Sequence, residues 1–267
     1  MDLKLRGRVA LVTGAWRGTG RGIAHVLARE GAAVWVHGFE RDAAERVAGE
    51  LRAAGGDAEA VAGDLLCEAG SLAIAERVHG HSGRLDVLVN NYGVAEGPGW
   101  LDGGDADWLL SYQKNVLSGV RLVRHFLPGM RERRFGRVIF VSTIGATRPQ
   151  AALPHYYAAK SALANMSVSL AQEAAGCGIT VNCVSPGLIA TDEVVESFLR
   201  RGAERGWGTT WEEVEPHAAR SFFDAPSGFV GTPEDVGQLV AFLASELARY
   251  VNGATLRIDG GASGCVS

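Results

Sequence analysis

A tyrosine and a lysine lie four residues apart in the stretch PHYYAAKSA, residues 154–162. On a helix, residues four apart share a face, so Tyr156 and Lys160 would lie together and Tyr157 would point elsewhere. A phenol with a pKa of about 10 keeps its proton at neutral pH, and a nearby ammonium favours the ionised form. The pair can therefore exchange a proton with a substrate oxygen. Alone, the spacing also fits a helix start with one buried and one surface tyrosine.

A glycine-rich stretch, TGAWRGTGRG, begins at Thr13 and directly follows an apolar run. Glycines at 14, 18 and 20 permit a tight turn and a close backbone approach to a ligand, and the N-terminus of a following helix offers free N–H groups to a pyrophosphate. Structural loops also use glycine. The position between a first strand and a first helix makes a nucleotide site the stronger interpretation.

Short runs rich in Val, Ile and Leu alternate with longer segments of helical period, a pattern typical of a parallel sheet covered on both faces. At 267 residues the chain is long enough for one large core. The sequence predicts an α/β protein, a doubly wound Rossmann fold with a seven-stranded parallel sheet, in a single domain over 1–267. The expected strands are 8–13, 32–38, 58–63, 85–90, 137–142, 179–185 and 254–259.

Helices are expected between these strands. Asp105 is the candidate N-cap of a helix that runs to about Arg134 and bends at Pro128. Another helix is expected to begin near His155 and to end at the glycines of 176–178. Tyr156 and Lys160 would then lie in the first two turns of a helix.

An irregular segment at about 192–230 is too long for a simple connector. Disorder is one interpretation, but Trp207, Trp211, Phe222 and Phe223 favour packing, so we expect a helical substrate lid. We further expect Trp207, Trp211 and Phe222 to line or cap the substrate pocket.

Composition excludes several function classes. The net charge is −4 with acids and bases mixed, so no basic patch indicates a nucleic acid or a membrane surface as partner. The 4 cysteines form no close pair, and no long apolar segment occurs, which predicts a soluble cytoplasmic protein with reduced thiols. No metal site is expected, because HGH at 79–81 fits a helix terminus and DGGDAD at 102–107 fits helix capping.

Six short motifs occur in family order, and the chain resembles the classical short-chain dehydrogenases/reductases, in particular the ketoreductases like 3-oxoacyl-acyl-carrier-protein reductase. The resemblance covers essentially the whole chain and implies a nicotinamide dinucleotide cofactor. The motifs are TGAWRGTG at 13–20, GDL at 63–65, NNYG at 90–93, QKN at 113–115, YYAAK at 156–160 and SPGLIAT at 185–191.

The resemblance implies catalytic roles. Tyr156 would be the acid or base at the carbonyl oxygen, and Lys160 would favour its phenolate and hold the nicotinamide ribose. Asn115 would anchor a water that connects Lys160 to solvent. The fourth role, a hydroxyl that donates to the carbonyl, falls on Thr143 by a gapless count from Tyr156, which we favour, or on Ser142 by alignment on Gly145.

Cofactor choice depends on charge near the adenosine ribose, where an acid selects NAD and arginines pair with the 2'-phosphate of NADP. Phe39 stands where the acid is expected and Arg17 lies in the glycine turn, so NADP(H) is favoured and NAD(H) is less expected. Arg41 is a second candidate phosphate partner, with Glu40 beside it as a competing acid. The implied cofactor-binding residues are Gly14, Arg17, Gly18, Thr19, Gly20, Phe39, Arg41, Asp64, Leu65, Asn91, Tyr92, Gly93, Tyr156, Lys160, Pro186, Gly187, Ile189 and Thr191.

Tyr92 departs from the family, which usually has alanine there, and would either pack passively or contact the substrate. We expect an NADP-dependent oxidoreductase that reduces a small-molecule ketone or oxidises a secondary alcohol, working as a homo-oligomer, a tetramer or dimer, as the family commonly does. The alternatives are an NAD-dependent alcohol or polyol dehydrogenase and a nucleotide-sensing regulator without turnover. The substrate itself stays open, because one fold serves many substrates.

Overall fold

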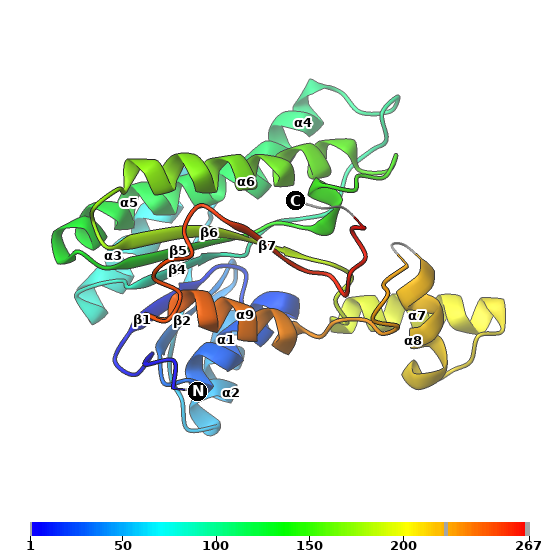
Figure 1. Cartoon of the computed structure of the whole chain (residues 1–267), viewed down its shortest axis with the longest axis horizontal. Helices are drawn as coiled ribbons and strands as arrows, with labels where there is room; N and C mark the ends of the chain where they lie inside the picture. The colour runs from blue at the N-terminus through cyan, green and yellow to red at the C-terminus, as the bar shows by residue number, and fades with distance from the viewer. Residues whose placement is uncertain (1, 222–223, 265–267) are drawn as a thin grey trace.

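The computed structural model describes residues 2–221 and 224–264 and contains a twisted, fully parallel sheet with helices on both faces (Figure 1). The strand order is β3-β2-β1-β4-β5-β6-β7, so the seven-stranded doubly wound fold is confirmed. The strands are β1 (Val9–Val12), β2 (Ala33–Gly38), β3 (Asp57–Ala62), β4 (Val87–Asn90), β5 (Gly136–Val141), β6 (Ile179–Pro186) and β7 (Thr255–Ile258).

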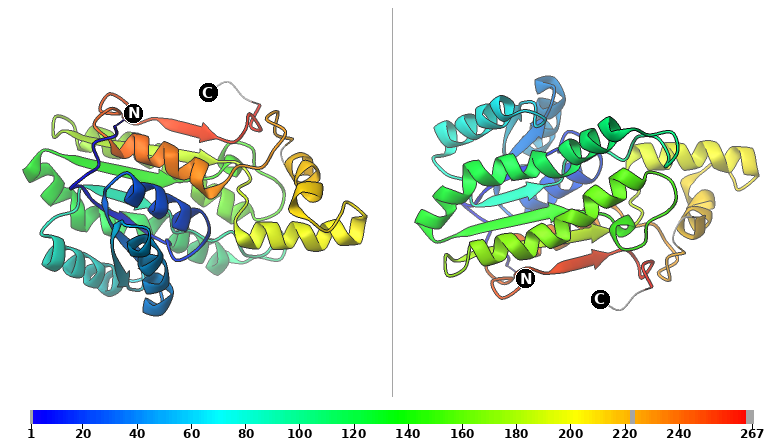
Figure 2. Two further views of the ribbon diagram at one scale, coloured as in Figure 1. Left: turned by 90° about the horizontal axis from the view of Figure 1, so that it is seen from below. Right: turned by 90° about the horizontal axis from the view of Figure 1, so that it is seen from above.

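The two faces of the sheet carry different helices (Figure 2). Apolar side chains of α1 (Gly18–Arg29), α2 (Arg41–Ala53) and α9 (Pro233–Ala244) pack on one face. Those of α3 (Glu68–Ser82), α5 (Ser118–Arg133) and α6 (Pro154–Glu173) pack on the other. Because both faces are covered, strands such as β1 and β4 are buried along their whole length.

Strand order reverses between β1 and β4, where successive crossovers leave in opposite directions and open a crevice at the carboxyl edge of the sheet. Thr13 closes this junction, since its hydroxyl accepts hydrogen bonds from the N–H groups of Asn91 and Tyr92, both 3.0 Å. The turns after these two strands are thereby held together.

The helix after β4 differs in detail from the expectation. Its first part, α4 (Asp105–Tyr112), is capped by Gly104, whose N–H donates to the Asp107 carboxylate at 3.0 Å, so Asp105 is not the N-cap. A π-helical turn, Gln113–Leu117, then joins α4 to α5, which continues through Pro128. Such wide turns recur at functional sites, and this one carries Asn115.

The segment expected to be a helical insertion contains α7 (Asp192–Arg205) and α8 (Trp211–Ser221), which stand beyond the carboxyl ends of the strands in Figure 1. Thr191 caps α7, because its hydroxyl accepts from the N–H of Val194 at 3.4 Å. Phe222 and Phe223 lie outside the described residues. The two helices share a small apolar core of their own, built on Phe198 and Val214.

Candidate active site

A cleft of about 740 Å³ runs along the carboxyl edge of the sheet, from the glycine-rich turn to the first turns of α6. Its walls come from segments far apart in sequence. The lining residues include Gly14, Trp16, Arg17, Gly18, Thr19, Gly20, Phe39, Asn91, Tyr92, Gly93, Ser142, Thr143, Tyr156, Tyr157, Lys160, Pro186, Gly187, Ile189 and Thr191. Most of the residues predicted from sequence therefore meet in one place.

The glycine turn at one end of the cleft is built for close backbone contact. Gly14 and Gly18 have φ angles of 65° and 53°, which side chains rarely tolerate. A Cβ on Gly20 would lie 2.3 Å from the carbonyl oxygen of Gly14, so no larger residue fits. The N-terminus of α1 begins here and can bind a pyrophosphate. The turn thus fits a dinucleotide cofactor.

His37, at the end of β2, lies directly beneath this turn, and the sequence offered no recognised motif for it. Its Nδ1 accepts from the N–H of Gly14 at 3.2 Å, and its Nε2 lies 3.0 Å from the carbonyl oxygen of Gly63. Because an N–H group can only donate, Nδ1 must be unprotonated and Nε2 must carry the proton. Burial lowers the His37 pKa to about 4, against the opposing effect of the Gly63 hydrogen bond.

The two candidate hydroxyls after β5 point to different partners. Ser142 donates to the carbonyl oxygen of Lys160 at 2.8 Å and is buried, so its hydroxyl is already used in positioning α6. Thr143 hydrogen-bonds the phenol of Tyr156 and lies on the cleft. The geometry therefore favours Thr143 as the hydroxyl available to a substrate.

Lys160 and Asn115 converge on Gly93 at the base of the cleft. The Lys160 ammonium is buried and donates to the carbonyl oxygen of Val141 at 2.8 Å. The Asn115 Oδ1 accepts from the N–H of Val94 at 2.9 Å. A Cβ on Gly93 would lie 2.5 Å from this Oδ1 and 2.6 Å from the Lys160 Nζ. Only glycine at position 93 leaves room for both groups.

Burial shifts the pKa values of both members of the Tyr156–Lys160 pair. Burial raises the pKa of Tyr156 to about 12, and the Thr143 hydrogen bond partly opposes this rise. Burial also lowers the pKa of Lys160 to about 8. Tyr156 therefore holds its proton firmly at neutral pH and is poised as an acid.

Three predicted cofactor residues lie off the cleft lining. Arg41 is exposed at the start of α2, and Leu65 is buried in the core. Asp64 is exposed, and its carboxylate accepts from the N–H of Leu66 at 2.8 Å. The predicted phosphate partner Arg17 does line the cleft, but it pairs with Glu193 of α7 at 3.0 Å.

An aromatic cluster lies beside the glycine turn. The rings of Phe39 and Tyr92 lie 4.9 Å apart, and Trp16 from the glycine turn lies 5.8 Å from Phe39. Tyr92 is half-buried, and its pKa is raised to about 12 by burial and by the neighbouring Glu96 and Asp64 carboxylates. Tyr92 therefore packs within this wall, and Trp16 is a lining residue that the sequence analysis did not single out.

The sequence-based interpretation of Tyr157 as a residue away from the site is wrong. Tyr157 lines the cleft, and its ring centroid lies 5.5 Å from that of Tyr156. A Cβ on Gly145 would lie 2.0 Å from the Tyr157 ring, so this glycine makes space for the second tyrosine. No short sequence pattern predicts this contact, because a loop separates Gly145 from Tyr157 in the chain.

The expectation that Trp207 and Trp211 line the substrate pocket is also wrong. Both pack against the core shared by α7 and α8, and Trp207 stacks on His217 with ring centroids 4.8 Å apart. Phe222, the third residue of that expectation, lies outside the described residues. The two tryptophans stabilise the helical pair itself.

Within residues 2–221 and 224–264, no group of three or more His, Cys, Asp or Glu side chains is placed to hold a metal ion. Helices in the same ranges are too short or too polar to cross a bilayer. The HGH histidines lie in the last turn of α3, as expected for a helix terminus.

Known proteins share this chain's sequence over almost its full length. A family model described as enoyl-(acyl carrier protein) reductase matches residues 14–263. The oxidoreductase YvaG of Bacillus subtilis is 36% identical over 98% of both chains. The 3-oxoacyl-acyl-carrier-protein reductase FabG of Escherichia coli is 32% identical over 97% of this chain and 98% of the relative.

Solved structures that are similar to this chain contain different cofactors and substrates. The L-sorbose reductase of Gluconobacter frateurii, complexed with NADPH and L-sorbose, has a TM-score of 0.92 and 32% identity over 100% of both chains. A 7α-hydroxysteroid dehydrogenase complexed with NADH and a 7-oxo bile acid conjugate has a TM-score of 0.84 and 30% identity over 98% of this chain and 96% of the other.

Proposed function

Because the chain belongs to the short-chain dehydrogenase/reductase family of oxidoreductases, we propose that it transfers hydride between NADP(H) and a ketone or secondary alcohol. The observation that carries this proposal is the convergence of Tyr156, Thr143 and Lys160 at one end of a single cleft whose other end is the glycine turn. A dinucleotide bound along the cleft would reach from the turn to the proton donor. The bound nicotinamide supplies or accepts the hydride.

In the direction of reduction, the Tyr156 phenol donates its proton to the carbonyl oxygen. Its pKa of about 12 keeps it protonated at neutral pH, and the neighbouring Thr143 hydroxyl supplies a second donor to the same oxygen. Lys160, with a pKa of about 8, is mostly charged at neutral pH and offsets the negative charge left on the phenol. Asn115 is assigned to anchor a water that connects Lys160 to solvent.

Ketone reduction is the better supported direction. Oxidation of an alcohol requires Tyr156 as a base, and burial works against forming the phenolate in the cofactor-free protein. A positively charged oxidised nicotinamide would partly offset this cost. We therefore propose a carbonyl reductase that also runs in reverse at higher pH.

NADP(H) is the proposed cofactor because Arg17 stands at the cleft and the end of β2 offers Phe39 in place of an acid. Binding of NADPH and NADH to the purified protein, followed by fluorescence, separates NADP from NAD dependence. Arg17→Ala should weaken the binding of NADPH at least tenfold and leave the affinity for NADH within about twofold of the wild-type value. Arg46→Ala, an exposed arginine on α2, is the matched control. Tighter binding of NADH by the wild-type protein would instead establish the NAD-dependent alternative.

Turnover is tested with NADPH and a panel of ketones. Tyr156→Phe should abolish NADPH oxidation while NADPH binding persists, because only the proton donor is removed. A wild-type protein that binds NADPH but turns over no ketone or alcohol would favour the nucleotide-sensing alternative. Retained activity in Tyr156→Phe would refute the assigned acid.

We also propose a cytoplasmic homo-oligomer, a dimer or tetramer. The apolar side chains of Leu109, Leu110 and Trp100 are exposed on and before α4, which supports a contact between copies. The free thiols of Cys67, Cys177 and Cys183 support a reducing compartment. Sedimentation of the purified protein at several concentrations tests the assembly.

A further inference from the structure

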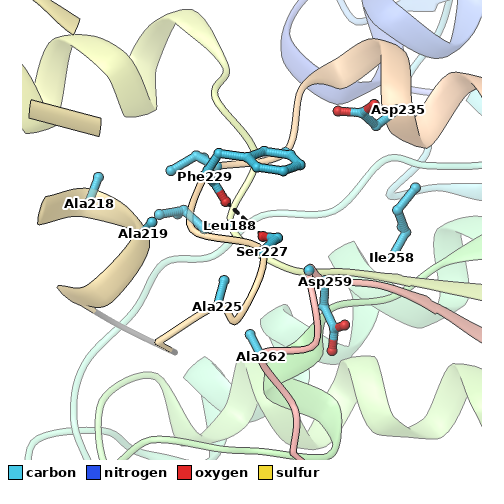
Figure 3. Close-up of a pocket in the computed structure, with 13 residues that line it drawn as sticks. Leu188, Ala218, Ala219, Ala225, Ser227, Phe229, Asp235, Ile258, Asp259 and Ala262 are labelled. Carbon is cyan, nitrogen blue, oxygen red and sulfur yellow. Dashed lines mark hydrogen bonds between the residues drawn. The ribbon is translucent and has the colours of Figure 1, made fainter. Parts of the chain in front are cut away.

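A second, smaller cavity of about 200 Å³ lies between α8, the segment that leads to α9, and the turn after β7 (Figure 3). It is separate from the reaction cleft and has no role in the steps described above. Its lining is dominated by alanines and larger apolar side chains. The apolar members are Leu188, Ala218, Ala219, Ala225, Phe229, Val230, Ile258 and Ala262.

The polar side chains at this cavity are engaged with the protein itself. Ser227 donates to the carbonyl oxygen of Phe229 at 3.3 Å, the bond drawn in Figure 3. The Asp259 carboxylate accepts from the N–H groups of Gly261 and Ser263, both 3.0 Å. Asp235 accepts from the N–H of Thr232 at 2.7 Å. These bonds occupy part of the polar surface of the cavity, and the two carboxylates would repel an anion.

Leu188 connects this cavity to the reaction cleft, because its side chain lines both. The neighbouring backbone is fixed, since the Ala190 N–H donates to the carbonyl oxygen of Gly231 at 2.7 Å and Ile189 bridges to the same residue. Leu188 is the one described residue common to the two linings, and it lies between well-anchored segments.

The reaction cleft is apolar where it approaches Leu188. Ile144, Leu153 and Val194 line it, and Tyr157 adds an aromatic surface. The charged side chains along the described lining are engaged in pairs, Arg17 with Glu193 and Lys114 with Glu96, apart from Lys160, which donates to a backbone carbonyl. Among these described residues only Lys160 has no carboxylate partner, and its side chain is buried.

We propose that the cavity behind Leu188 binds the apolar chain or ring of the substrate, which is an uncharged ketone whose carbonyl reacts at Tyr156. This inference rests on the proposed function and names its substrate class. An apolar cavity of about 150 Å³ accepts a benzene ring, so this cavity has room for one ring or a short alkyl chain. Each methylene that enters it should raise kcat/KM roughly fourfold.

The test is a series of unbranched 2-ketones of increasing chain length, assayed for kcat/KM with NADPH. The wild-type value should rise steeply with each methylene until the cavity is filled and then level off. Ketones that end in a carboxylate should react at least tenfold more slowly than neutral ketones of equal length.

Plugging variants connect the chain-length effect to the cavity. Ala219→Phe should flatten the dependence on chain length and leave the shortest ketone within about twofold. Ala203→Phe, at an exposed position on α7, is the matched control and should keep the wild-type profile. If Ala219→Phe does not fold, Ala225→Leu fills the same cavity from a loop.

The outcomes separate the two proposals. Measurable reduction with no dependence on chain length, or with the same dependence in the plugged variants, overturns the cavity as a substrate site and leaves the proposed function intact. A preference for carboxylated ketones also overturns it. Failure to reduce any ketone overturns the proposed function and this inference with it.

Discussion

Replacing His37 tests whether one buried imidazole ties the glycine turn to the neighbouring strand ends. His37 is fully buried, accepts from Gly14 and lies within hydrogen-bond distance of Gly63. His37→Asn keeps an acceptor close to the ring Nδ1 position, and His37→Gln keeps a donor close to the Nε2 position. Neither replacement titrates between pH 4 and 7, so each removes the proton equilibrium of the imidazole.

The size of the effect follows from the pKa shift. The folded protein has a His37 pKa of about 4, against 6.5 for an ordinary histidine. Between these values the unfolded chain binds a proton that the folded protein refuses. The contribution of neutral His37 to the free energy of unfolding is therefore fully present above about pH 6.5. As the pH falls toward 4, this contribution is lost, by about 3 kcal/mol in total.

The pH-dependent contribution of His37 to the free energy of unfolding is measured by urea unfolding of the wild type and both variants. The experiment covers several pH values from about 7.5 to about 4.5. At the highest pH the variants should be less stable than the wild type, by roughly 1–3 kcal/mol, because a buried backbone group loses its partner. The difference in stability between the wild type and the variants should decrease steadily on acidification, because only the wild type is destabilised by protonation of His37 in the unfolded chain. NADPH binding should weaken as well, because the Gly14 turn is less firmly held.

The two variants control for each other, because both lack the titration but lose different hydrogen bonds. The free energy of unfolding should change with pH in the same way in both variants, and the two should differ only by a constant amount. A wild-type slope that equals the variants' slope would refute the assigned tautomer and its pKa. Unchanged stability of His37→Gln at neutral pH would refute the role of the Gly14 hydrogen bond, because that variant lacks the Nδ1 acceptor.

Four further predictions concern the catalytic end. Thr143→Ala should lower kcat/KM for ketones by roughly a hundredfold, whereas Ser142→Ala should mainly cost about 1 kcal/mol of stability in urea unfolding; the reverse pattern would reassign the donor. Gly93→Ala places a Cβ within 2.6 Å of the Lys160 Nζ. This variant should reduce kcat by roughly a hundredfold without unfolding the protein. Normal turnover would contradict the packing described. Ketone reduction should fall as the pH rises through about 8, where Lys160 loses its proton, and a rate constant up to pH 10 would exclude that dependence. Trp207→Ala should lower the melting temperature and leave kcat/KM within about twofold, because the ring packs on His217 inside the helical pair, whereas a large kinetic loss would place it at the substrate.

Sequence patterns predicted the framework well because their signals are local. The apolar runs and intervening helical periods located all seven strands to within two residues. The glycine turn and the Tyr156–Lys160 spacing each lie within a few residues of chain, and both line the cleft as expected. The family resemblance added Asn115, which packs beside Lys160 behind that lining.

Other features could not be read from sequence because they depend on contacts between distant segments. Ser142 and Thr143 both line the cleft, and only the folded protein shows that the Ser142 hydroxyl is used by the Lys160 carbonyl whereas Thr143 hydrogen-bonds Tyr156. Arg17 meets Glu193 across 176 positions of chain. The burial that raises the pKa of Tyr156 likewise exists only in the folded protein.

The sequence by itself determined the sheet, the glycine turn and the Tyr156–Lys160 pair, since backbone periodicity and short spacings encode them. Tertiary structure decided the surroundings of that pair. It brought Tyr157 into the cleft through the space at Gly145, turned Trp207 into the core of the helical pair, and left an apolar cavity behind Leu188. These outcomes depend on which side chains fill space against one another, and close packing is a property of the whole fold.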